Sequence, residues 1–186
     1  MTTQKAPLER FLNLLRTKKI KKYISGKKVL DFGCGQSAWT ARILASECTS
    51  IVGIDSSLDL EESQVEGVTL FNHLDCLRSK SFDVILMLAV IEHIRPFDFR
   101  HLLSQFLDIT TSQSLIVATI PTTKARPVLE LLSFKLGLID PSQIRDHKVY
   151  YDDLWLNEIL HETSWELSFY KTFQFGLNSL VVLSRR

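Results

Sequence analysis

The most informative stretch of this chain is Val29-Leu30-Asp31-Phe32-Gly33-Cys34-Gly35. It indicates a short buried strand that ends in a glycine-rich turn and leads into a helix. Glycine at such a turn lets the backbone approach a ligand, because it has no side chain to clash. The amide groups at the start of the helix suit an anionic or polar group. The stretch therefore predicts a ligand-binding turn at the carboxyl end of the first strand.

A second polar turn follows the next strand-like segment. Asp55 comes directly after Ile51–Ile54, twenty residues beyond Gly35. A carboxylate at the end of the second strand can accept both ribose hydroxyls of an adenosine. The alternative is that Asp55 only caps a helix, and that Gly33 and Gly35 only form a tight turn.

A third polar turn, Asp75-Cys76, follows the strand-like segment Val68–Phe71. The Asp75 carboxylate could take the amino group of an adenine, with the Cys76 amide facing a ring nitrogen. In an open parallel sheet these three turns lie at the carboxyl ends of neighbouring strands, where ligands bind. We therefore expect the three turns to form one pocket.

Strand-like and helix-like segments alternate along most of the chain. Crossover helices between strands imply a parallel sheet, and near-continuous apolar strands imply burial on both faces. The last two strand-like segments are close enough for a hairpin. We expect an α/β fold with a doubly wound sheet, mostly parallel, that ends in a C-terminal antiparallel hairpin. The expected strands are Lys28–Phe32, Ile51–Ile54, Val68–Phe71, Phe82–Ala89, Ser114–Ile120, Glu166–Gln174 and Leu177–Ser184.

At 186 residues the chain has the length of one domain. We divide this domain into a basic amphipathic helix (1–27), a cofactor-binding core (28–120), an inserted substrate-side segment (121–150), and the last helix with the hairpin (151–186).

The N-terminal segment is strongly basic. Its first 28 residues carry nine lysines and arginines against the single Glu9, whereas the rest of the chain is net negative. One interpretation is a helix that packs on the core and leaves Lys18, Lys19, Lys21 and Lys22 in solvent. The other is a weak contact with an anionic surface or substrate through the electric field of these lysines.

Several classes of protein are not expected. The longest apolar run, Val84–Ile91, has eight residues, far below the ~20 of a membrane-spanning helix, and no signal peptide is apparent. Basic and aromatic residues do not alternate as in a nucleic-acid platform, so no nucleic-acid partner is expected. Three cysteines without a paired spacing favour a reduced, cytoplasmic protein. No metal site is expected, because the histidines are scattered; they are His73, His93, His101, His147 and His161.

Three stretches, VLDFGCG, IVGIDSS and SFDVILMLAVIEHI, resemble successive motifs of the class I S-adenosylmethionine-dependent methyltransferases. They are most similar to the small-molecule branch that carries an E-H-I motif after the fourth strand. The resemblance covers about residues 28–120 motif by motif and the rest by topology. NAD binding is the second interpretation of the pocket, but Ala38 occupies the third glycine position of the dinucleotide fingerprint.

The resemblance implies a Rossmann-like fold and S-adenosylmethionine as the cofactor. It implies methyl transfer to a small molecule, a glycan or a lipid precursor, with oxygen as the expected acceptor atom and nitrogen or carbon still open. The alternative is an inactive cofactor-binding scaffold or regulatory subunit with the same fold. The implied cofactor-binding residues are Asp31, Gly33 and Gly35 at the methionine part, Asp55 and Ser56 at the ribose, Asp75 and Cys76 at the adenine, and Leu88 and Ala89 along the cofactor.

Candidate catalytic residues lie in two places. His93 belongs to the E-H-I turn, which the resemblance places above the reactive end of the cofactor; the alternative is that it only hydrogen-bonds the cofactor or caps the turn. His147 and Tyr150 lie in Arg145–Tyr151, which resembles a segment of bacterial members associated with glycan or lipid modification. The alternative for this segment is a polar loop with Tyr150 packed against the core.

Overall fold

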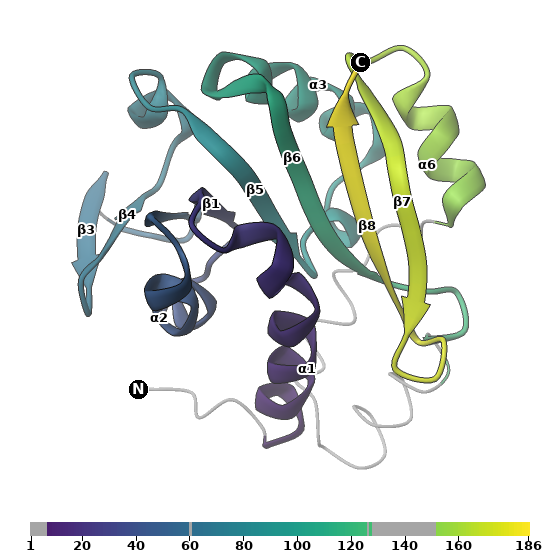
Figure 1. Cartoon of the computed structure of the whole chain (residues 1–186), viewed down its shortest axis with the longest axis horizontal. Helices are drawn as coiled ribbons and strands as arrows, with labels where there is room; N and C mark the ends of the chain where they lie inside the picture. The colour runs from purple at the N-terminus through teal and green to yellow at the C-terminus, as the bar shows by residue number, and fades with distance from the viewer. Residues whose placement is uncertain (1–6, 60, 126, 128–151) are drawn as a thin grey trace.

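The computed structural model describes residues 7–59, 61–125, 127 and 152–186. Its centre is one eight-stranded sheet with the strand order β3-β4-β2-β1-β5-β6-β8-β7 (Figure 1). The strands are β1 (Lys28–Phe32), β2 (Ser50–Ile54), β3 (Glu62–Val65), β4 (Val68–Phe71), β5 (Phe82–Leu88), β6 (Thr110–Pro121), β7 (Trp165–Phe173) and β8 (Asn178–Arg185).

The middle of the sheet is parallel and both of its edges are antiparallel. Strands β4, β2, β1, β5 and β6 run in the same direction, whereas β8 runs against β6 and β7 runs against β8. The predicted α/β fold, a mostly parallel sheet with a C-terminal antiparallel hairpin, is confirmed.

Helices cover both faces of the sheet (Figure 1). Helices α1 and α2 lie on one face, and α3 and α6 lie on the other. Short 3₁₀ turns join several strands and helices. The helices are α1 (Pro7–Ile24), α2 (Trp39–Leu44), α3 (Pro96–Gln105) and α6 (Asp153–Leu160), and the 3₁₀ turns are η1 (Ala45–Glu47), η2 (Leu74–Leu77), η3 (Ile91–His93) and η4 (Phe106–Ile109).

Helix α1 packs on the sheet through the end nearest β1. Ile20 and Ile24 are fully buried in the same apolar cluster as Val29 of β1. Lys18 and Lys19, on the opposite side of the helix, are exposed. Burial of the isoleucines fixes the helix, because each fully buried aliphatic side chain contributes about 1.5–3 kcal/mol. In the described part of the chain, no helix is long and apolar enough to cross a membrane.

The opposite face is held by α3, α6 and the first residue of β7. Trp165 is fully buried, and its indole N–H donates to the carbonyl of Leu103 at 3.0 Å. This bond satisfies the one polar atom of a large apolar ring. Helix α6 begins at a capping carboxylate, because Asp152 Oδ1 accepts the Trp155 N–H at 2.9 Å.

The structure differs from the sequence prediction at one edge of the sheet. Strand β3 was not expected, because its sequence ESQV is polar; it pairs antiparallel with β4 only, at the sheet edge, where polar side chains remain in solvent. The segment Arg145–Tyr151 lies outside the described residues.

Candidate functional site

A cavity of about 640 Å³ opens at the carboxyl ends of β1, β2, β4 and β5. The strand order reverses beside β1, which has β2 on one side and β5 on the other. Open α/β sheets bind ligands at this point, and the volume is that of a small-molecule or cofactor site. Helix α3 contributes Leu102 and Gln105 to the facing wall.

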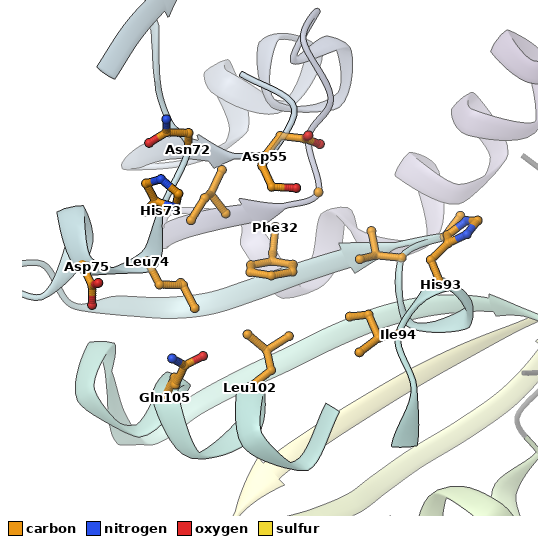
Figure 2. Close-up of a pocket in the computed structure, with 15 residues that line it drawn as sticks. Phe32, Asp55, Asn72, His73, Leu74, Asp75, His93, Ile94, Leu102 and Gln105 are labelled. Carbon is orange, nitrogen blue, oxygen red and sulfur yellow. The ribbon is translucent and has the colours of Figure 1, made fainter. Parts of the chain in front are cut away.

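The cavity is long, and its polar groups are spread along it. Figure 2 shows Asp75 and Leu74 at one end, His93 at the other end, and the ring of Phe32 between them. Asp55 lies above Phe32 in this view. A ligand in this space would therefore contact several strand ends at once.

Gly33 makes the turn after β1 possible for two reasons. Its φ angle is +79°, a conformation that residues with a side chain rarely adopt. A Cβ atom at this position would also lie 2.6 Å from Val90 Cγ2, in the loop after β5. Glycine thus brings the β1 and β5 loops together at the cavity wall.

The same turn is tied to the end of β2. The N–H groups of Gly33 and Cys34 both donate to the carbonyl of Ile54, at 2.8 and 3.1 Å. Burial, with smaller contributions from the carboxylates of Asp31 and Asp55, raises the pKa of the Cys34 thiol to about 12. Cys34 therefore stays protonated at neutral pH and acts as a packing residue rather than a nucleophile.

Asp55 is held from two sides by internal hydrogen bonds. Its Oδ2 accepts the N–H of Gly35 at 2.7 Å. Its Oδ1 accepts the N–H of Ser57 at 2.9 Å and the hydroxyl of Ser57 at 2.6 Å. These bonds fix the carboxylate at the cavity wall next to Ser56.

The loop after β4 places residues in the cavity that the sequence analysis did not single out. Asn72 and His73 follow β4 directly and line the cavity. Asp75 also lines it, but is exposed and ion-paired with Arg78 at 2.7 Å. Cys76 is not among the lining residues, and its thiol donates to Glu61 Oε1 at 3.3 Å.

The other end of the cavity is formed by the turn after β5. Ala89 has a φ angle of +58°, and its N–H donates to the carbonyl of Thr119 at 2.9 Å. This hydrogen bond joins the end of β5 to β6. After it the chain leaves the sheet and enters η3. Ala89, Val90 and His93 then line the cavity.

Glu92, the neighbour of His93, points into the protein. It is 1% exposed, and Oε2 has no hydrogen-bond partner among the residues that the structure describes. Burial raises the pKa of this carboxyl to about 7, although the nearby Arg16 guanidinium of α1 acts in the opposite direction. The E-H-I turn therefore places the His93 side chain in the cavity wall and buries the Glu92 side chain outside the cavity.

The structure thus gathers part of the predicted site into one cavity. The predicted residues that line it are Gly33, Asp55, Ser56, Asp75, Ala89 and His93. Those that lie outside its lining are Asp31, Gly35, Cys76 and Leu88. His147 and Tyr150 lie outside the described residues. Among the described residues, no group of three or more histidine, cysteine or acidic side chains could hold a metal ion.

The doubly wound sheet, its terminal antiparallel hairpin and the cavity at the strand ends define a class I methyltransferase, whose methyl donor is S-adenosylmethionine. The model of a family described as "Methyltransferase domain" matches residues 4–167. The chain belongs to this family and is a methyltransferase, as the motif resemblance predicted. None of the curated proteins compared with the chain matches it.

Solved structures share the fold at low sequence identity. A SAM-dependent methyltransferase from Archaeoglobus fulgidus is 17% identical, with a TM-score of 0.62 over 93% of this chain and 94% of the other. A SAM-dependent methyltransferase from Anabaena variabilis is 13% identical, with a TM-score of 0.65 over 98% and 86%. Magnesium protoporphyrin IX methyltransferase from Synechocystis PCC 6803 with bound SAH is 13% identical, with a TM-score of 0.61 over 96% and 84%.

Proposed function

We propose that the protein transfers a methyl group from S-adenosylmethionine to a hydroxyl oxygen of a small molecule, a sugar or a lipid precursor. The observation that carries this proposal is the arrangement along the cavity, with Asp75 at one end and His93 at the other (Figure 2). The first end suits an adenosine, and the second offers a base to an acceptor.

The residues of the cavity fit the cofactor. Asp55 holds the ribose hydroxyls at the end of β2. Asn72 Oδ1 is buried without a hydrogen-bond partner in the described part of the chain, and an adenine amino group would provide the missing donor. Phe32 and Leu74 give the base apolar contacts. When bound, S-adenosylmethionine supplies an electrophilic methyl group on a positively charged sulfur.

The chain has two tasks at the other end of the cavity. Apolar side chains of Val90 and Ile94 exclude water from the space around the acceptor. His93 accepts the proton of the acceptor hydroxyl, since histidine is the side chain that most often does so near neutral pH. His147 and Tyr150 remain further candidates for contact with the acceptor.

An acceptor of modest size fits the proposal. The Synechocystis relative in fold acts, by its name, on magnesium protoporphyrin IX, which is a small molecule. The cavity of about 640 Å³ must hold both the adenosyl group and the reacting part of the acceptor. The larger part of a glycan or lipid precursor would then extend beyond it.

The proposal is tested by a panel of hydroxyl-bearing phenols, sugars and lipid precursors, with S-adenosylhomocysteine formation as the measurement. With the acceptor that turns over, His93→Ala should lower kcat about 10²–10⁴-fold, the usual contribution of a general base. Binding of S-adenosylhomocysteine should be largely retained.

His101→Ala is the matched control, because His101 is exposed on α3 and outside the cavity. It should leave kcat unchanged. Turnover that is equal in His93→Ala and in the wild type would remove His93 from the mechanism. Methylation of nitrogen or carbon in the identified product would overturn the assignment of oxygen.

We further propose a weak contact between α1 and an anionic surface. Lys18 and Lys19 are exposed, whereas Lys21 pairs with Glu47 at 2.7 Å and Lys22 lies over the ring of Tyr23. The apolar side chains at the end of α1 pack against the sheet, so the contact would be electrostatic rather than an insertion into lipid.

A further inference from the structure

The Asp55 carboxylate, which the proposed function assigns to the ribose, already has three hydrogen-bond donors. Two of them, the N–H and the hydroxyl of Ser57, meet the same oxygen, Oδ1, at 2.9 and 2.6 Å. The third, the N–H of Gly35, meets Oδ2 at 2.7 Å. The two oxygens of the group are therefore unequally occupied.

A carboxylate offers about four acceptor positions, two on each oxygen. Recognition of both ribose hydroxyls by one carboxylate needs one open position on each oxygen. Oδ2 keeps such a position beside the Gly35 N–H. Oδ1 has none, because Ser57 fills both. Binding of the ribose through both oxygens thus requires that Ser57 gives up one bond.

The two donors of Ser57 differ in how readily each can give up its hydrogen bond to Asp55. The N–H is fixed by the turn, in which the Leu58 N–H donates to the Asp55 carbonyl at 3.2 Å. The Ser57 carbonyl is also held, by the side-chain amide of Gln36 at 3.2 Å. The hydroxyl rotates about a single bond, and Ser57 is exposed, so water can replace the carboxylate as its partner.

We propose that the Ser57 hydroxyl competes with the ribose for Asp55 and thereby sets the affinity for the adenosyl cofactor. This inference rests on the proposed role of Asp55. Ser57 does not line the cavity, whereas its neighbour Ser56 does. Ser57 acts through the carboxylate only and is a positioning residue that holds Asp55 in the absence of the cofactor.

The test is calorimetry of the full chain with S-adenosylhomocysteine. Ser57→Ala removes the competing hydroxyl and keeps the N–H, so the affinity should rise about three- to tenfold, the net worth of one hydrogen bond. Ser57→Thr restores a hydroxyl and should bind like the wild type. Because the lost bond stabilises the free protein, Ser57→Ala without ligand should melt a few degrees below the wild type, whereas Ser57→Thr should melt at the wild-type temperature.

Asp55→Ala, measured in parallel, separates the role of Asp55 at the ribose from the competition by the Ser57 hydroxyl. If Asp55→Ala weakens binding while Ser57→Ala binds equally or more weakly than the wild type, the competition is overturned and the role of Asp55 stands. If Asp55→Ala binds like the wild type, the ribose assignment fails and the competition fails with it. Tighter binding by both Ser57→Ala and Ser57→Thr would also overturn the competition, because the hydroxyl would not be the cause.

Discussion

At the scale of single residues, the Asp55 carboxylate is held by hydrogen bonds from Gly35 and Ser57. Asp55 was predicted from its place after a strand, and the structure puts it in the cavity wall. Its bonds to Ser57 and Gly35 depend on one side-chain rotamer, which no spacing in the sequence encodes. Likewise, nothing in the letters E-H-I indicates that Glu92 is buried, with Arg16 of a helix more than 60 residues earlier in the chain near its carboxyl.

Glu92 gives a prediction on stability and pH. Burial raises the pKa of its carboxyl from 4.5 to about 7. Below pH 4.5 the group is protonated in both the folded and the unfolded chain. As the pH rises to 7, the unfolded chain loses this proton first, so the folded state loses about 3 kcal/mol of relative stability. Glu92→Gln cannot ionise and should not show this loss.

The measurement is urea unfolding at pH 4, 5.5, 7 and 8. The free energy of unfolding of Glu92→Gln, relative to the wild type, should increase across this range and then level off. Glu62→Gln, at an exposed position on β3, is the control for loss of one carboxylate. A difference between Glu92→Gln and the wild type that does not change with pH would show that burial does not govern this carboxyl.

At the scale of helices and strands, apolar runs were the reliable signal. The strands β1, β2, β4 and β5 and the second half of β6 were predicted because these segments are rich in apolar residues, whereas the polar start of β6, Thr110–Gln113, was not predicted. The polar edge strand β3 was missed, since a strand paired on one side needs little apolar sequence. Asp75 and Cys76 were predicted to contact the adenine because they form the polar turn after β4. The residues that directly follow this strand are Asn72 and His73, and both line the cavity.

Helix α1 gives a prediction on surface binding. The double charge reversal Lys18→Glu/Lys19→Glu should weaken binding to vesicles of anionic phospholipid at least tenfold, because each lysine near such a surface contributes about 1 kcal/mol. Since both side chains are exposed, the melting temperature should stay close to that of the wild type. The measurement is co-sedimentation with vesicles at low and at physiological salt.

Two controls accompany this measurement. Zwitterionic vesicles should not bind the wild type, and Lys80→Glu, on the loop before β5, should bind anionic vesicles as the wild type does. Equal binding to both kinds of vesicle, or binding unaffected by the reversal at Lys18 and Lys19, would remove α1 as an anionic contact.

At the scale of the whole molecule, the sheet order explains the site. The carboxyl ends of β1, β2, β4 and β5 meet at one edge, and the turn after each contributes to the cavity. This convergence was predictable, because parallel strands joined by crossovers share one edge. The contribution of Leu102 and Gln105 was not, since it depends on how α3 packs across the sheet. The motif resemblance connected this architecture to methyl transfer, and the family match confirms it.

We propose that this edge of the sheet binds an adenosyl group, with Asp55 on its ribose. Isothermal titration calorimetry of the wild-type chain with S-adenosylmethionine tests it most directly. We expect one bound molecule per chain, and Asp55→Ala should weaken binding about ten- to hundredfold through the lost bonds to the ribose. Asp59→Ala, an exposed carboxylate of the same loop, should bind like the wild type. The absence of any binding by the wild-type chain would show that this edge of the sheet is not an adenosyl site.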